Sequence, residues 1–168
     1  MNPALRFLCV LALGACSGGA LHAQAGDPQL AAVRSAIDAA ERGQFDAAQA
    51  SALSRHPLYG WVEYAGLKRG IDGVSNAQGQ DFLRRYAGQP VAEAFRSVWL
   101  PSLARRQDWP TLLANWKPSD NLGLRCAQLN ARQATGQVDA QWTRDAQALW
   151  RSGGKPLPDA CDPVFAVL

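Results

Sequence analysis

The side chains suited to acid–base chemistry are few. Cleavage of a glycosidic bond needs a positioned carboxylic acid and often a second carboxylate at a set distance, and the only glutamates are Glu41, Glu63 and Glu93. We expect Glu41 and Glu93 on the polar faces of helices. Glu63 is expected to be partly buried and paired with Lys68 or Arg69, which is a structural role rather than a catalytic one.

The remaining candidates for chemistry also point to structural roles. His56 precedes Pro57, where a helix is expected to start, and a capping or packing role fits that position. The sequence contains no Gly-rich phosphate loop, no Ser/His/Asp pattern and no arrangement around a nucleophilic cysteine. We therefore predict no catalytic residue, no metal ligand and no cofactor.

The first 25 residues have the pattern of an export signal. Arg6 supplies the positive charge, residues 7–15 form a short apolar run, and residues 23–25 (Ala-Gln-Ala) form a small-residue cleavage site. The apolar run is too short to span a bilayer. Cys16 leaves a lipoprotein anchor open as an alternative. In either case we expect the mature protein, from residue 26 to residue 168, to leave the cytoplasm.

Export affects the interpretation of the cysteines. Cys9 and, unless it is acylated, Cys16 leave with the signal, so Cys126 and Cys161 remain as an even pair in an oxidising compartment, which favours a disulfide. Closing that loop would stabilise the fold by about 4 kcal/mol on the chain-entropy account. The alternative is a metal site, for which only His56 and His22 could add ligands.

The aromatic and basic side chains do not form an obvious binding motif. Five of the six tryptophans fall on apolar helix stripes, where core packing explains them: Trp99, Trp109, Trp116, Trp142 and Trp150. Tyr59 and Trp61 are the aromatic candidates for an exposed surface. The arginines are scattered on polar faces: Arg34, Arg84, Arg85, Arg105, Arg106, Arg144 and Arg151.

Composition favours an all-α fold. The 168 residues are 48% apolar and 18% charged with a net charge of +3, enough apolar content for a core and too mild a charge to predict a nucleic-acid partner. Ala and Leu, which favour helices, outnumber the β-branched residues that favour strands.

Helix signals divide the mature chain into about eight short helices. Asp27-Pro28 and Gln89-Pro90 combine a start signal with proline at the first helical position. Pro101 should kink or interrupt its helix. The expected segments run from Pro28 to Gly43, Gln44 to Arg55, Pro57 to Leu67, Ser75 or Asn76 to Tyr86, Gln89 to Leu103, Asp108 to Lys117, Ser119 or Asp120 to Gly136, and Val138 to Gly153.

Two features concern the organisation of these helices. A turn followed by an apolar helix start recurs weakly along the chain, with a period near 30 residues. This repeat predicts helical hairpins stacked into an α-superhelix that is U-shaped or part of a ring. An irregular helical bundle is the alternative. Near the end, Asp162-Pro163 opens an apolar helix that stops at Leu168, so we expect the chain to be truncated at its C-terminus.

Three blocks of sequence resemble the N-terminal superhelical domain of the soluble lytic murein transglycosylase family. The first runs from His56 to Tyr64. The second comprises Phe82 to Tyr86, Trp99-Leu100 and Leu103 to Trp109. The third comprises Cys126, Gly136-Gln137, Leu149-Trp150 and Pro158 to Phe165, and it places both cysteines where the family has a disulfide.

The resemblance implies a periplasmic enzyme family that cleaves the β-1,4 bond between N-acetylmuramic acid and N-acetylglucosamine without water, leaving a 1,6-anhydro product. The family's catalytic glutamate, usually followed by serine, lies on a C-terminal lysozyme-like domain. Here Arg, Tyr and Ala follow the three glutamates, so no catalytic residue carries over. The chain is expected to be the helical domain alone, with glycan strands of peptidoglycan and the missing catalytic domain as partners, and no membrane segment after leader removal. A non-catalytic adaptor or glycan-binding module is the alternative.

Overall fold

The computed structural model describes residues 28–152 and 156–168, and all regular structure in those residues is helical. The predicted export signal and Cys16 lie outside the described residues. In chain order the elements are α1 (Pro28–Glu41), α2 (Ala47–Ser51), α3 (Tyr59–Arg69), the 3-10 turn η1 (Ile71–Gly73), α4 (Asn76–Arg85), α5 (Pro90–Arg105), α6 (Trp109–Ala114), α7 (Leu122–Ala134), α8 (Ala140–Arg151), the 3-10 turn η2 (Asp159–Cys161) and α9 (Asp162–Phe165).

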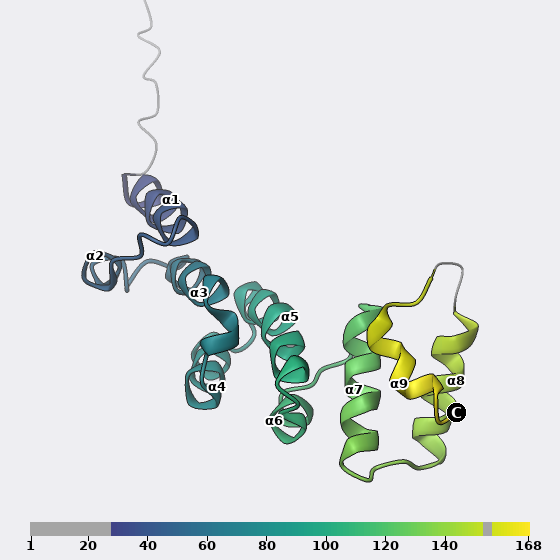
Figure 1. The fold of residues 1–168 in the computed structure, drawn as a ribbon. Coiled ribbons are helices and arrows are strands. Elements are labelled where there is room, and N and C mark those ends of the chain that lie inside the picture. Colours follow the sequence, from purple (N-terminus) through teal and green to yellow (C-terminus); the bar gives the residue numbers. More distant parts are fainter. Residues whose placement is uncertain (1–27, 153–155) are drawn as a thin grey trace, which may run out of the picture.

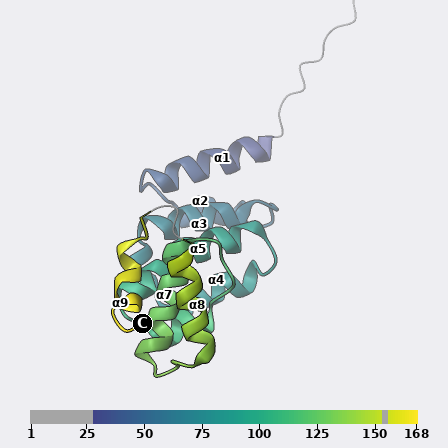
Figure 2. The same ribbon diagram turned by 90° about the vertical axis from the view of Figure 1, so that its right-hand side faces the viewer.

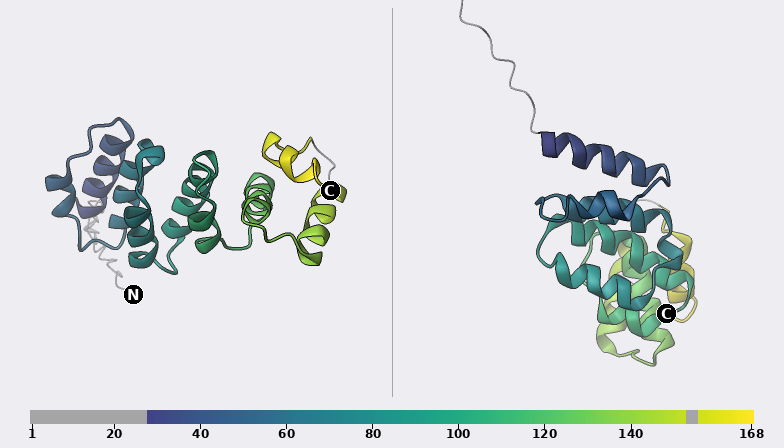
Figure 3. Two further views of the ribbon diagram at one scale, coloured as in Figure 1. Left: turned by 60° about the horizontal axis from the view of Figure 1, so that its bottom comes forward. Right: turned by 90° about the vertical axis from the view of Figure 1, so that its left-hand side faces the viewer.

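The helices form an elongated stack in which each packs on near neighbours in the sequence. α1 packs on α3, α3 on α5, and α5 on α4, α6 and α7, while α7 also contacts α8 and α9. Figure 1 shows this progression from purple to yellow, with α1 and α8 at opposite ends of the row. The left view of Figure 3 shows the same row from another side, and Figure 2 looks along it from the α8 end. The predicted all-α superhelical stack is confirmed.

Side chains that accept hydrogen bonds from the first turn begin five of the described helices. The first is α2, where the Asp46 carboxylate accepts from the backbone N–H of Ala48 at 2.8 Å. At the start of α4 the Ser75 hydroxyl accepts a hydrogen bond from the backbone N–H of Gln78. In turn, the side-chain carbonyl of Gln78 accepts one from the backbone N–H of Ser75. Carboxylate or amide oxygens do the same for three later helices: Asp108 for α6, Asn121 for α7 and Asp139 for α8. The predicted start of the seventh helix, at Ser119 or Asp120, is therefore one or two residues early.

The helix expected from Gln44 to Arg55 is mostly absent. Only Ala47–Ser51 is α-helical, after Gly43 turns the chain with a φ of +78°. The next residues form i→i+3 turns, as in the Leu53 amide bonded to the Ala50 carbonyl at 2.9 Å. Ala50 is buried in the small core between α1 and α3, so tertiary packing supports one helical turn and not three.

Of the two effects expected of Pro101, a kink or an interruption, the interruption does not occur. α5 runs unbroken from Pro90 to Arg105. Pro101 has no backbone N–H, so the Ser97 carbonyl four positions earlier lacks its helical hydrogen bond. Ser97 lies on the exposed side of the helix. On the opposite side, Trp99 and Leu103 are fully buried, and this packing holds the helix together across the proline.

The core consists of three clusters along the stack. A small one joins α1 to α3, a large one surrounds the aromatic side chains of α4 and α5, and a third lies between α7, α8 and α9. Within the large cluster the rings of Phe95 and Trp99 stack at 5.5 Å between centroids. The indole of Trp99 lies against Gly79 of α4, so closely that a Cβ built there would be 2.2 Å from a ring carbon.

The C-terminal segment is fastened to α7 by a disulfide. Cys126 of α7 and Cys161 of η2 are both completely buried, and their Cα atoms are 4.8 Å apart. Trp142 and Leu149 of α8 pack in the same cluster. Trp150 does not: it is 62% exposed, and its ring meets the Phe165 ring in a T-shaped contact with 4.9 Å between centroids. Its expected place in the core is therefore wrong.

Candidate functional site between helices α3 and α4

The densest polar cluster of the described residues joins α3 to the end of α4. The Arg85 guanidinium pairs with the Glu63 carboxylate at 2.6 Å and with Asp81 at 2.7 Å. The Tyr86 hydroxyl donates to the same Glu63 oxygen, and Arg84 pairs with the other oxygen of Asp81. Asp81 and Arg85 are four positions apart on one face of α4, the spacing at which opposite charges meet on a helix.

The environment shifts several pKa values in this cluster. Burial, and then the hydrogen bond to Glu63, raises the pKa of the Tyr86 phenol, so the ring stays neutral and donates. Burial opposes the charge on Arg85, but the hydrogen bonds to Glu63 and Asp81 outweigh it and raise the pKa of the guanidinium. The hydrogen bond from Arg85 lowers the pKa of Asp81. The cluster is a network of ion pairs and hydrogen bonds that joins α3 to the end of α4.

A hollow of about 340 Å³ opens beside this cluster. We call it the α3–α4 hollow; its lining residues are Phe45, Glu63, Gly66, Leu67, Gln78, Asp81 and Arg85. Phe45 is 40% exposed, and its ring lies over Gly66, with 3.4 Å between the ring and the position of an added Cβ. The lining also contains polar side chains, of which Glu63, Asp81 and Arg85 are held by ion pairs. The arrangement suits a polar, uncharged ligand that has an apolar face.

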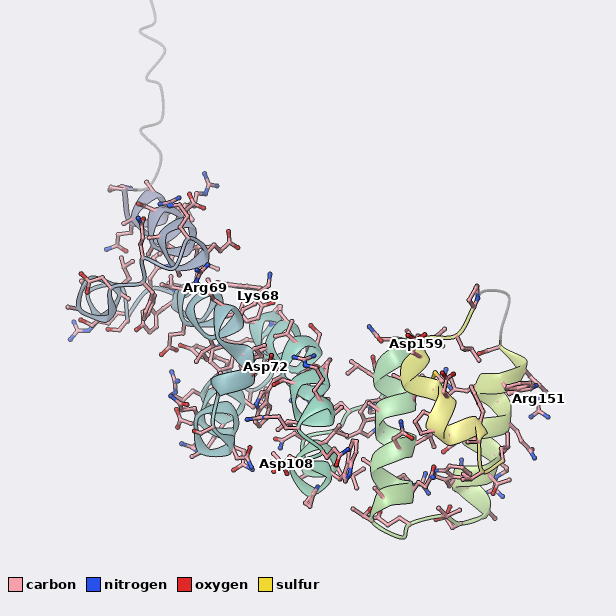
Figure 4. All side chains as sticks on the ribbon, viewed as in Figure 1. Lys68, Arg69, Asp72, Asp108, Arg151 and Asp159 are labelled. Atoms are coloured by element: carbon pink, nitrogen blue, oxygen red, sulfur yellow. A yellow bond between two sulfur atoms is a disulfide. The ribbon has the colours of Figure 1, made fainter. Side chains whose placement is uncertain are left out.

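Glu63 is partly buried, as predicted, but its partners differ from those expected. Lys68 and Arg69 follow it by five and six positions, which places them on other faces of the helix. The Lys68 ammonium lies over the Tyr64 ring, 5.9 Å from its centroid. Arg69 reaches instead to the Glu41 carbonyl at 3.3 Å, at the junction of α1 and α3 that Figure 4 shows.

The other sequence candidates have structural roles. The His56 ring accepts from the Leu58 amide at 3.1 Å, in the turn before α3. Tyr59 packs against the core between α1 and α3, and burial, with the nearby Glu63 charge, raises the pKa of its phenol. Trp61 packs against the large core and meets the Tyr64 ring edge-on. Neither aromatic forms an exposed platform.

The arginines do not merge into one basic surface. Arg105 pairs with Asp72 at 2.5 Å, and Arg106 donates to the carbonyls of Asp72 and Val74. Arg144 donates to a Gln141 side chain. In residues 28–152 and 156–168 no group of three or more His, Cys, Asp and Glu side chains is arranged to hold a metal ion. Within the same ranges no helix combines the length and the hydropathy of a membrane span.

Sequence reasoning missed most of the α3–α4 hollow. The spacing of Asp81, Arg84 and Arg85 was available as an ion-pair signal on one helix face. The contact with Glu63, 22 positions away, carries no local signal. Phe45 lies in the segment without regular structure between α1 and α2, where it is 40% exposed.

The fold defines a superhelical domain of stacked helices, a class in which curved surfaces bind extended partners. No protein-family model matches the chain. Curated relatives do match: it is 36% identical over 118 residues to the soluble lytic murein transglycosylase of Salmonella typhimurium and 35% identical to that of Escherichia coli K12. Each match covers 68% of this chain and 18% of the relative. The chain thus spans less than a fifth of the length of these relatives.

Solved structures agree with this relationship. The 70-kDa soluble lytic transglycosylase in complex with bulgecin A superposes with a TM-score of 0.70 at 29% identity, covering 84% of this chain and 23% of that one. The Escherichia coli enzyme gives 0.68 at 29% identity, with 83% and 22% covered. Over the matched segment the chain is therefore similar to the soluble lytic murein transglycosylases in both sequence and fold.

Proposed function

We propose that the chain is the non-catalytic helical domain of a periplasmic lytic transglycosylase and that it binds the glycan strands of peptidoglycan. The observation that carries this proposal is the 36% identity to a soluble lytic murein transglycosylase across most of the chain. Bond cleavage, between N-acetylmuramic acid and N-acetylglucosamine with a 1,6-anhydro product, is assigned to a part of the relatives outside the matched segment.

The arrangement of the glutamates supports a non-catalytic role. An acid catalyst of glycoside cleavage needs a proton to deliver to the leaving oxygen. Glu63 receives a hydrogen bond from Tyr86 and pairs with Arg85. Glu93, on an exposed face of α5, is paired with Arg96 at 2.6 Å and with Lys117 at 3.1 Å. Both carboxylates are engaged as acceptors within the domain.

The α3–α4 hollow is the surface that we assign to the glycan. A sugar ring has apolar C–H faces and a rim of hydroxyl groups, so it is matched by an aromatic ring beside fixed donors and acceptors. Phe45 supplies the ring, and the side chains of Gln78 and Arg85 supply polar groups. The proposed export signal at residues 1–25 and the buried disulfide both suit a protein that works outside the cytoplasm.

Binding is tested by sedimentation of the purified chain with peptidoglycan sacculi at low salt. The chain is expected in the pellet, and Phe45→Ala should reduce the pelleted fraction. Leu58→Ala is the matched control, because Leu58 is equally exposed (39% against 40%) but lies outside the hollow. A chain that stays in the supernatant would refute glycan binding. Release of anhydro-muropeptides by this chain alone would refute the non-catalytic assignment.

A further inference from the structure

A second hollow, of about 320 Å³, lies between α7, α8 and the loop that precedes α7. We call it the α7–α8 hollow. Its apolar floor is formed by Leu129 and Leu149, each 1% exposed, and Trp116 of the loop forms one wall. Arg125 and Gln128 of α7 also line it, one helical turn apart and therefore on the same face.

Arg125 differs from the other arginines of the domain. Among the described residues, no carboxylate lies within ion-pair distance of it, and its guanidinium makes no hydrogen bond. Arg34 and Arg151 are also without such a partner but are exposed, and Figure 4 shows Arg151 at the outer side of α8. Arg125 is half-buried. A partly desolvated charge without a counter-ion is unfavourable, and an anion brought by a ligand would relieve that cost.

The remaining polar groups of the hollow are compatible with an anionic ligand. Asp145, the one carboxylate in the lining, is already engaged: Arg132 lies at 3.5 Å and the Gln141 amide donates to it at 2.7 Å. The Gln128 amide forms no hydrogen bond with any described residue, so both its donor and its acceptor are open to a ligand.

We propose that the α7–α8 hollow binds a saccharide that carries a carboxylate, with the carboxylate on Arg125 and the sugar ring against Trp116. A guanidinium binds a carboxylate through two parallel hydrogen bonds, which fixes its orientation. The volume is at the lower end of the range for small-ligand sites, which fits one sugar unit and not an oligomer.

The identity of the sugar rests on the proposed function. Of the two sugars in the strands that the domain is proposed to bind, N-acetylmuramic acid carries a lactyl group that ends in a carboxylate, and N-acetylglucosamine lacks it. The hollow is therefore assigned to an N-acetylmuramic acid unit whose lactyl carboxylate is free of peptide.

The two monosaccharides themselves are the probes. Titrations of the purified, isotope-labelled chain, followed by NMR through the Trp116 indole and Arg125 side-chain signals, are expected to show N-acetylmuramic acid binding about tenfold more tightly than N-acetylglucosamine, because a hydrogen bond to a charged group is worth that much. Arg125→Gln should abolish the difference. Arg151→Gln, which removes an unpartnered but exposed arginine, should preserve it.

Three outcomes would overturn the assignment: equal binding of the two sugars, an unchanged preference in Arg125→Gln, or no perturbation of Trp116 at saturating N-acetylmuramic acid. Since Arg125 has no partner among the described residues and its charge is partly desolvated, Arg125→Gln should not lower the unfolding temperature, and this can be checked for each variant. Sedimentation with sacculi separates the two proposals. Binding to sacculi without selective monosaccharide binding refutes the α7–α8 hollow alone, whereas a failure to sediment refutes the glycan-binding function.

Discussion

Replacement of Gly79 by alanine should destabilise the domain, although the same change usually strengthens a helix. Gly79 lies inside α4, where its missing side chain allows Trp99 of α5 to approach the backbone. A Cβ at this position would lie 2.2, 2.4 and 2.6 Å from three atoms of the indole. Carbon atoms in contact normally lie about 3.5–4.0 Å apart, so either the ring or the helix must move by more than 1 Å.

Two opposing terms determine the size of the effect. Alanine favours a helix interior over glycine by about 1 kcal/mol. Overpacking a filled core costs about 1–3 kcal/mol and occasionally more, and the indole cannot swing away because it is completely buried and stacked on Phe95. We expect a net loss of about 2 kcal/mol, which for a domain of this size lowers the unfolding temperature by roughly 4–8 °C.

The assay is urea and thermal unfolding followed by far-UV circular dichroism, with Gly66→Ala as the matched control. Gly66 is also inside a helix, but its nearest neighbour, at 3.4 Å, is the exposed ring of Phe45, which can yield. The control should be neutral or slightly stabilising. In a Trp99→Leu background the cost of Gly79→Ala should shrink, because the obstructing ring is gone. If Gly79→Ala is as stable as the wild type, the close contact between Gly79 of α4 and Trp99 of α5 is refuted.

Three further predictions concern the disulfide, the caps and pH. Reduction of the disulfide, or the double substitution Cys126→Ala with Cys161→Ala, should lower the free energy of unfolding by about 4 kcal/mol because the two cysteines are 35 positions apart. Urea unfolding midpoints with and without reductant measure this loss, and unchanged midpoints would contradict the prediction. Asp108→Ala should cost about 1 kcal/mol, because the Asp108 carboxylate accepts from the Thr111 amide at 3.2 Å, while Asp108→Asn should cost less in the same titration. Because the pKa of the Tyr86 phenol is raised in the folded protein, the unfolded chain loses the phenol proton at a lower pH than the folded chain does. The contribution of Tyr86 to the free energy of unfolding is therefore complete below about pH 10 and is lost as the pH rises toward the pKa of the folded state. Tyr86→Phe should flatten that alkaline limb of the stability profile, and an unaltered limb would exclude Tyr86 as its source.

The accuracy of the sequence predictions depended on how far each signal reaches along the chain. Caps and apolar stripes act within one or two helical turns, and the predicted starts at Pro28, Pro90 and Asp108 agree with the structure. The helix expected from Gln44 to Arg55 had comparable local signals. It shortened to one turn, and among the residues of α2 whose burial is described Ala50 alone is buried in the core that α1 and α3 share.

The candidate site was much less predictable than the helices. The Glu63 carboxylate could be recognised as partly buried from its neighbours, but its partners come from α4, more than 20 positions away. The choice among several arginines depends on the angle at which α3 and α4 cross, and no local pattern encodes that angle. Trp150 was placed in the core because it continues the four-residue spacing of Trp142 and Ala146, yet it is 62% exposed.

By itself, the sequence determined that this protein is an all-α stack of short helices, because helix propensity, caps and apolar periodicity are local and agree with one another. It also carried the three blocks that resemble the soluble lytic murein transglycosylase family. Only the tertiary structure decided which charges meet at Glu63, that α5 continues through Pro101, and that Arg125 remains unpaired in a hollow. These features arise where faces of different helices come together, and the geometry of that packing depends on the whole set of buried side chains at once.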